Sequence, residues 1–155
     1  MLGISPEAAK EWQRRTEAEF SLWAKNKANC DATGMNNFYG MQQLALVAWL
    51  QSGDVFPVFK RRNPTPVNPY SLRIHLVEAD RCVPPPSTGG TAVAHITDGK
   101  NPENGNRIFD GVEVDNDGMV VAYYVHNTYP WQTTTEPTKW TRVEPTAPGQ
   151  ACRTS

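Results

Sequence analysis

The sequence changes its hydrophobic period once, at Gly53. Before this glycine, apolar residues recur at spacings of three and four, which is typical of helices that bury one face. After it, short β-rich runs alternate with segments rich in proline and glycine. Helices in the first third of a chain, followed only by strands, predict an α+β fold with two N-terminal helices and then a small, mostly antiparallel β-sheet with long loops.

The first helix is expected to begin at Ser5-Pro6 and to run to about Asn26. Ser5 can cap the helix, and a proline is tolerated at the first helical position because its missing N–H needs no partner there. An apolar stripe along this helix is interpreted as core packing. Its members are Ala8, Trp12, Thr16, Phe20 and the pair Trp23 and Ala24.

A turn is predicted over residues 29–34, and Asn36 or Asn37 can cap a second helix that runs to Gln51 and ends at Ser52-Gly53. The last two turns of this helix are apolar on nearly every side, so we expect it to be deeply buried. Its expected inner face consists of Met41, Leu44, Ala45 and Ala48.

Five extended segments are predicted after Gly53. Residues 55–59 form a strand in which Pro57 cannot donate to a neighbour, which indicates an edge or a bulge. Residues 72–77 alternate as a half-buried strand, with a face of Leu72, Ile74 and Leu76. Residues 108–115 and 119–125 form a hairpin around Gly118, residues 138–143 add a short strand, and residues 82–106 are expected to be loop.

The length of 155 residues indicates one domain, which we place at residues 1–146, with an irregular tail at 147–155.

The net charge of −1 and the absence of a basic face argue against tight nucleic-acid binding; Lys60-Arg61-Arg62 is the one basic run. The longest apolar run, residues 44–50, is too short for a bilayer, which takes about 20 residues. Three cysteines without a secretory signal favour a reducing compartment.

No catalytic, cofactor-binding or metal-binding residue is predicted. The histidines His75, His95 and His126 are isolated, and no cysteine stands at ligand spacing from another ligand. Residues 115–118 resemble the opening of a calcium-binding EF-hand loop, but the twelfth position is His126 instead of glutamate, so we interpret them as a hairpin turn.

Two hypotheses remain open beside the resemblance to a known family that is given below. A metal-dependent nuclease or other hydrolase needs clustered carboxylates, and the candidates are Glu78, Asp80, Asp110, Glu113 and Asp115. A solvated strand face is the simpler interpretation of these acids. The third hypothesis is a free-standing protein-binding module that uses the 82–106 loop.

An ordered set of short segments resembles the lambda-type phage portal protein family. The set comprises residues 17–24, 29–34, 37–39, 43–45, 52–56, 76–81 and 110–115, with Gly118 and the pair Ala122 and Tyr123. The resemblance covers residues 5–146 and implies part of the outer wing of a subunit several times longer.

What the family implies is a structural protein, not an enzyme, without a cofactor. It forms a homo-oligomeric ring at one vertex of the virion after assembly in the host cytoplasm. Its implied partners are other portal subunits, the terminase motor, the capsid and head-completion proteins, and DNA passes through the ring without sequence-specific binding; no membrane is involved. Candidate subunit contacts are Tyr129, Trp131 and Trp140, and we expect the isolated chain to expose apolar surface and to self-associate.

Overall fold

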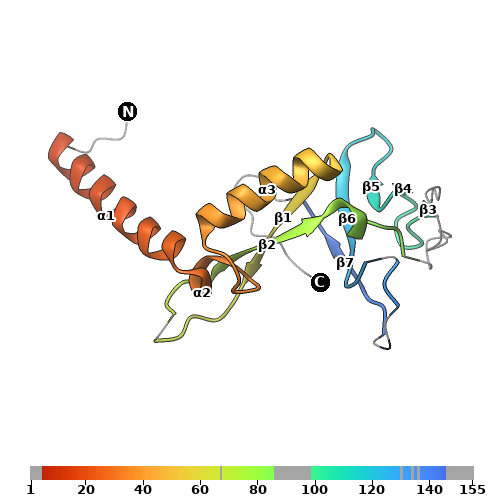
Figure 1. Cartoon of the computed structure of the whole chain (residues 1–155). Helices are drawn as coiled ribbons and strands as arrows, with labels where there is room; N and C mark the ends of the chain where they lie inside the picture. The colour runs from red at the N-terminus through yellow and green to blue at the C-terminus, as the bar shows by residue number, and fades with distance from the viewer. Residues whose placement is uncertain are drawn as a thin grey trace. The chain divides into compact units, whose positions relative to one another are not determined.

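The computed structural model describes residues 5–66, 68–85, 99–129, 131–133, 135 and 137–145. Within these residues, helices occupy the N-terminal part and two antiparallel sheets follow (Figure 1). The α+β class predicted from the change of period is therefore confirmed. The domain boundary at residue 146 stays a prediction, since the tail at 147–155 lies outside the described residues.

The helices begin and end where the capping residues predict. Helix α1, Pro6–Lys25, is capped by the Ser5 side chain, which accepts a hydrogen bond of 3.2 Å from the Ala8 amide. Helix α3, Phe38–Ser52, begins after Asn37, whose side chain accepts from the Gly40 amide, and ends at Gly53 with a positive φ of 86°. Between them lies a four-residue helix α2, Lys27–Cys30, which the sequence analysis assigned partly to a turn.

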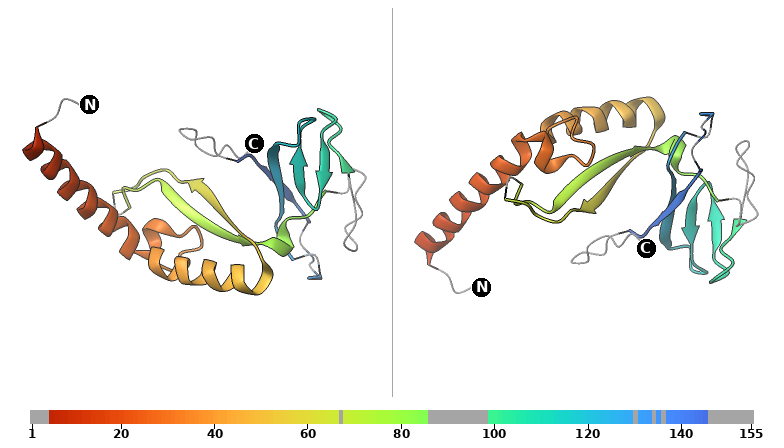
Figure 2. Two further views of the ribbon diagram at one scale, coloured as in Figure 1. Left: turned by 90° about the horizontal axis from the view of Figure 1, so that it is seen from above. Right: turned by 90° about the horizontal axis from the view of Figure 1, so that it is seen from below.

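The strands form two sheets. Strands β1, Val55–Arg61, and β2, Leu72–Glu78, make a two-stranded sheet, and the short 3₁₀ helix η1, Ala79–Arg81, follows. The second sheet has five antiparallel strands in the order of the chain, side by side in Figure 2. They are β3 Gly99–Lys100, β4 Arg107–Phe109, β5 Val112–Val114, β6 Val120–His126 and β7 Trp140–Val143.

The chain divides into two compact units. The first unit consists of Met1–Val47 and Phe59–His75, and the second consists of Ala48–Val58 and Leu76–Ser155. Each unit has its own buried residues and is described here by itself.

An aromatic cluster packs on the buried Trp23 of the first unit, although Phe20 is 46% exposed. The rings of Phe20, Trp23 and Phe38 lie 5.3 to 5.7 Å apart, and the indole N–H of Trp23 donates to the backbone oxygen of Leu72 at 2.9 Å. The predicted apolar stripe of α1 is only partly correct, because Trp23 and Ala24 are buried whereas Trp12 is 69% exposed. Only the last turns of α1 have a partner within the described residues.

The predicted turn at residues 29–34 is organised by the buried carboxylate of Asp31. It accepts hydrogen bonds of 2.8 to 3.0 Å from the backbone amides of Thr33, Met35 and Asn36. Burial opposes ionisation, but these hydrogen bonds outweigh it and lower the pKa of Asp31.

The predicted buried face of β2 is wrong. Leu72 is 42% exposed, whereas Arg73 and Val77, on the opposite side of the strand, are buried. Arg73 is drawn inward because its guanidinium donates to the backbone oxygen of Ala28. A prediction based on which strand face carries more apolar residues cannot detect an arginine that is buried by a hydrogen bond to a backbone oxygen.

The core of the second unit is aliphatic. Val58, Val77, Val125 and Val143 pack together, with Phe56 against them. Strand β1 thus contributes to the core on both sides of Pro57, which is tolerated because β1 has only one neighbour in its sheet.

The hairpin around Gly118 is confirmed, but its first strand is not continuous. The predicted run 108–115 turns back at Asp110 and Gly111, whose φ values are 45° and 81°, and so it forms both β4 and β5. Two consecutive positive φ values are typical of a tight hairpin turn, and Asp-Gly is a preferred pair for it. In the predicted 82–106 loop, residues 86–98 lie outside the described residues, while Gly99–Lys100 forms β3.

Candidate functional site

Among the described residues of the second unit, Glu113 on β5 has the side chain with the most hydrogen bonds. It has no exposed surface, and its two carboxylate oxygens accept five hydrogen bonds of 2.7 to 3.3 Å. The donors are the side chains of Asn101, Asn104, Asn106, Tyr124 and Arg142. A carboxylate has about four lone-pair positions, so this group is saturated.

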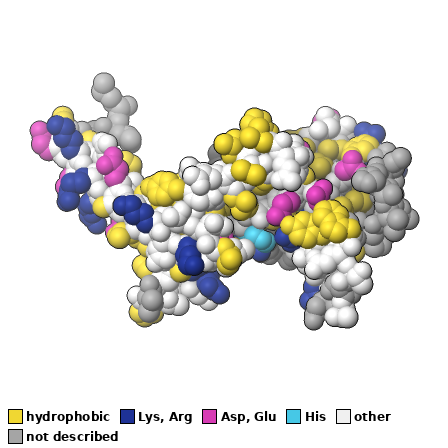
Figure 3. Space-filling model, in the orientation of Figure 1, with side chains coloured by type: hydrophobic (Ala, Val, Ile, Leu, Met, Phe, Trp, Pro, Cys, Tyr) yellow, Lys and Arg dark blue, Asp and Glu magenta, His cyan; other side chains and the backbone are white. Residues whose placement is uncertain are grey.

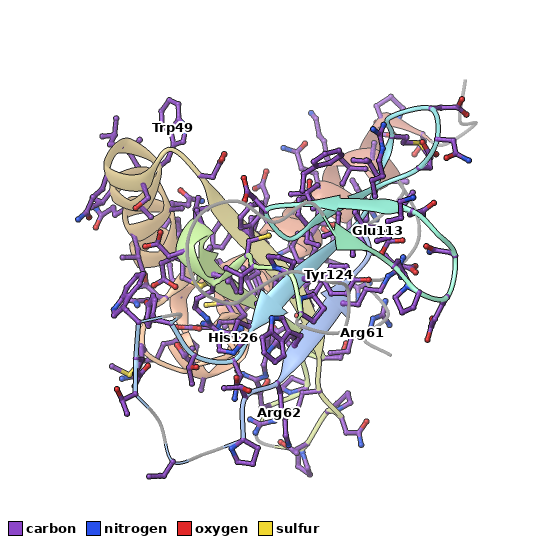
Figure 4. All side chains as sticks on the ribbon, turned by 90° about the vertical axis from the view of Figure 1, so that its right-hand side faces the viewer. Trp49, Arg61, Arg62, Glu113, Tyr124 and His126 are labelled. Carbon is purple, nitrogen blue, oxygen red and sulfur yellow. The ribbon has the colours of Figure 1, made fainter. Side chains whose placement is uncertain are left out.

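The sheet register explains this arrangement. Glu113 pairs with Ala122 on β6, and Tyr124, two residues further on the same face, pairs with Arg142 on β7. Glu113 and Tyr124 consequently meet on one face of the sheet (Figure 4), and Arg142 also reaches the carboxylate. The three asparagines come from the turn between β3 and β4 and complete the set.

The same contacts determine the ionisation of the site. Burial alone would raise the pKa of Glu113, but hydrogen bonds, first that from Arg142, hold it at about 2. Burial and the contact with the carboxylate raise the pKa of Tyr124 to about 12. The site therefore holds an ionised Glu113 and a protonated Tyr124 across the neutral pH range.

Sequence reasoning placed Glu113 on a solvated strand face, and this interpretation is wrong. The counter-charge of Glu113 is Arg142, which lies 29 residues away on β7. The signal that was available is the group Asn101, Asn104 and Asn106, amide donors just ahead of a strand that carries a glutamate.

The other acids of the hydrolase hypothesis have separate local roles. Asp110 is exposed in the tight turn between β4 and β5. Asp115 accepts hydrogen bonds of 2.9 Å from the amides of Asp117 and Met119, so the segment that resembles an EF-hand loop is a hairpin turn, as predicted. Among the described residues, no group of three or more histidine, cysteine, aspartate or glutamate side chains is placed to hold a metal ion.

The described cysteines are buried thiols. Burial is the main cause that raises the pKa of Cys30, with the neighbouring charge of Asp31 adding to it, and burial raises the pKa of Cys82 to about 11. Both thiols are therefore protonated at neutral pH, and a protonated thiol is a poor nucleophile.

The three predicted contact aromatics lie in or beside the last strand of the second unit. Tyr129 and Trp131 form a stacked pair with ring centroids 5.1 Å apart, and Trp131 is 68% exposed. Trp140 is half-buried, and its ring packs 4.5 Å from that of His126. Trp131 is thus open at the surface, whereas Tyr129 and Trp140 are half-buried.

Helix α3 carries the largest departure from the sequence analysis. It was expected to be deeply buried, but among its residues only Met41 is buried. Leu50 is 72% exposed, and Trp49 extends away from the ribbon of the helix (Figure 4). The exposed apolar residues of α3 are Tyr39, Leu44, Leu46, Val47, Trp49 and Leu50. Figure 3 shows hydrophobic side chains in yellow on the surface of the molecule.

The physical reason is the small amount of protein that packs on this helix within the described residues. Helix α3 has no charged residue along its 15 positions, so it lacks a charged face of the kind that a surface helix turns toward solvent. Among the described residues, no helix is both long enough and apolar enough to span a membrane. A face of this kind is typical of a contact with other protein.

A family model described as "Phage portal protein, lambda family" matches residues 1–147. The chain belongs to this family. The resemblance inferred from ordered short segments over residues 5–146 is thereby confirmed.

A relative within the portal family supports the assignment. The probable portal protein of the Halomonas phage phiHAP-1 is 28% identical over 123 residues, which are 79% of this chain and 21% of that protein. This chain therefore spans about a fifth of the length of its relative.

Proposed function

We propose that this chain acts as a structural part of a portal subunit, in a homo-oligomeric ring at one vertex of the virion, through which DNA is packaged and ejected. The observation that carries the proposal, beyond family membership, is the exposed and uncharged face of α3. We assign the chain to the outer wing of the subunit, and we propose no enzymatic activity and no cofactor.

The energetics of α3 support assembly. Burying one leucine or valine side chain is worth about 1.5–3 kcal/mol relative to leaving it exposed. The cluster Leu46, Val47 and Leu50 would therefore contribute several kcal/mol to a contact with neighbouring protein. A monomer in water does not gain this free energy, because the three side chains stay exposed.

The proposed partners are other portal subunits, the terminase motor, the capsid and head-completion proteins. Tyr129 and Trp131 are proposed as subunit contacts because they form a stacked pair in which Trp131 is 68% exposed. Trp140 is proposed with them as a half-buried aromatic residue of β7. Assembly takes place in the host cytoplasm.

The charge of the chain is compatible with a conduit for DNA. A protein that holds DNA tightly neutralises phosphates with a concentrated basic face, and this slows sliding. The chain carries 15 basic and 16 acidic residues, with a net charge of −1. Weak attraction to phosphate is what passage of DNA requires.

The test is to locate an epitope-tagged full chain in phage particles purified from the host that carries the gene. Labelling with gold-conjugated antibody is expected at one vertex per particle. The double variant Leu46→Glu and Leu50→Glu is expected to be lost from particles. The matched control Gln42→Glu and Gln43→Glu adds the same charge to exposed polar positions of α3 and is expected to remain. Absence of the unaltered chain from particles, or label spread over the whole shell, contradicts the proposal.

A further inference from the structure

The two compact units carry opposite charge. By sequence, the first unit has nine basic and five acidic residues, a net charge of +4. The second unit has six basic and eleven acidic residues, a net charge of −5. The overall charge of −1 conceals this separation.

The excess of positive charge in the first unit is concentrated at the end of β1. Lys60, Arg61 and Arg62 are consecutive and exposed, and Figure 4 labels the two arginines. Within the described residues, none of these three side chains takes part in an ion pair. We call residues 60–62 the basic segment, and no described contact brings an acidic side chain to it.

The second unit offers acidic and aromatic side chains together. A hydrogen bond with Glu78 raises the pKa of Tyr129, and the charge of Asp80 is close enough to act in the same direction. Asp80 is exposed, and Trp131 stacks on Tyr129 with most of its surface open to solvent. We call Glu78, Asp80, Tyr129 and Trp131 the acidic aromatic patch.

The neighbouring Arg81 places one positive charge beside this patch, and that charge acts against the rise in the pKa of Tyr129. The guanidinium of Arg81 donates to the backbone oxygens of His126 and Asn127, at 3.0 and 3.4 Å. The two carboxylates outnumber this guanidinium, and the exposed side chains of Asp80 and Trp131 remain available to a cation. Carboxylates pair with guanidinium groups, and the face of a tryptophan ring attracts a cation, most often arginine.

We propose that residues 60–62 of one copy of this chain bind the acidic aromatic patch of the next copy. The inference rests on the proposed function and names the surfaces through which subunits recognise each other. Two different surfaces meet in such a contact, so it is heterologous, and heterologous contacts generate rings when the rotation between copies closes. Complementary charge also suppresses the wrong registers, in which like surfaces would meet.

The experiment is a charge exchange on the full chain, followed by sedimentation velocity at low and high salt. Variant A is Lys60→Glu, Arg61→Glu and Arg62→Glu, and variant B is Glu78→Lys and Asp80→Lys. Each variant alone is expected to associate at least about tenfold more weakly than the unaltered chain at low salt. An equimolar mixture is expected to recover association, because the reversed segment of A then meets the reversed patch of B.

The matched control is Lys10→Glu, Arg14→Glu and Arg15→Glu, which changes the charge of the first unit equally at exposed positions of α1. It is expected to associate as the unaltered chain does. Equal weakening by the control, no recovery in the mixture, or association that variant A leaves unchanged overturns the inference. The inference is also overturned if variant A loses binding to short duplex DNA while its self-association is unchanged, because residues 60–62 would then bind phosphate groups. Incorporation into particles, tested separately, distinguishes failure of this contact from failure of the portal role.

Discussion

The Nε atom of Arg142 donates a hydrogen bond of 2.9 Å to the carboxylate of Glu113, which has no exposed surface. Glu113 is on β5 and Arg142 is on β7, so the ion pair crosses β6, which lies between them in the sheet. A buried charge that lost this partner would be left uncompensated, and that is costly. The pair therefore holds three strands of the second unit together.

Replacing Glu113 by glutamine should destabilise the protein strongly. The amide places donor hydrogens where asparagine and tyrosine donors point, and it leaves Arg142 without its buried counter-charge. We expect the free energy of unfolding to fall by about 3–5 kcal/mol in urea denaturation at pH 7. Glu144→Gln removes the exposed partner of Arg142 and is expected to cost less than about 1 kcal/mol. A loss below about 1 kcal/mol for Glu113→Gln would contradict this account of the network.

The same carboxylate predicts an acid dependence of stability. Its pKa is lowered from 4.5 to about 2 on folding, so the folded state favours the ionised form. The contribution, about 3 kcal/mol, is fully present above pH 5 and is lost as the pH falls through 4.5 toward 2. The difference in unfolding free energy between the unaltered chain and Glu113→Gln should shrink over this range. A difference that stays constant from pH 6 to pH 3 would exclude an ionised Glu113 as its cause.

Gly111 is expected to be intolerant of a side chain. A Cβ atom there would lie 2.6 Å from the backbone nitrogen of Val83, and the φ of 81° adds strain. We expect Gly111→Ala to cost more than about 2 kcal/mol in thermal or urea unfolding. Gly118→Ala is the control, because it has a similar φ of 85° but no atom within 4 Å of the added Cβ, and it should cost about 1–2 kcal/mol. Equal losses would show that close packing against Val83 is unimportant.

Trp131 is expected to matter for association and not for folding. Its side chain is 68% exposed, so Trp131→Ala should change the free energy of unfolding by less than about 0.5 kcal/mol while weakening self-association in sedimentation velocity. Trp12→Ala removes a tryptophan that is 69% exposed on α1 and serves as the control. If both variants associate equally well, Trp131 is not part of the contact.

Local chemistry made the element boundaries predictable. Ser5 with Pro6 marks the start of α1, Gly53 marks the end of α3, and Gly118 marks the hairpin between β5 and β6. Each of these signals depends on backbone geometry within a few residues, so one sequence is sufficient to detect it. The turn at Asp110-Gly111 was missed because the β-rich residues on both sides were taken as a single strand.

Burial was less predictable, because it depends on what packs against an element. The apolar residues of α3 were assigned to a core, but within the described residues this core does not exist, and Leu46 and Leu50 are exposed. Conversely, Glu113 was assigned to solvent, and its five donors bury it. Neither error concerns the local structure; both concern partners distant in sequence.

Sedimentation velocity of the purified full chain over a range of concentrations tests the central claim most directly, with the variant Leu46→Glu and Leu50→Glu in parallel. We predict that the unaltered chain associates as its concentration rises and binds a hydrophobic dye through α3. The variant should be monomeric with low dye binding, and Gln42→Glu with Gln43→Glu should behave as the unaltered chain. A monomer at every concentration with low dye binding would contradict the claim that neighbouring protein completes this part of a portal.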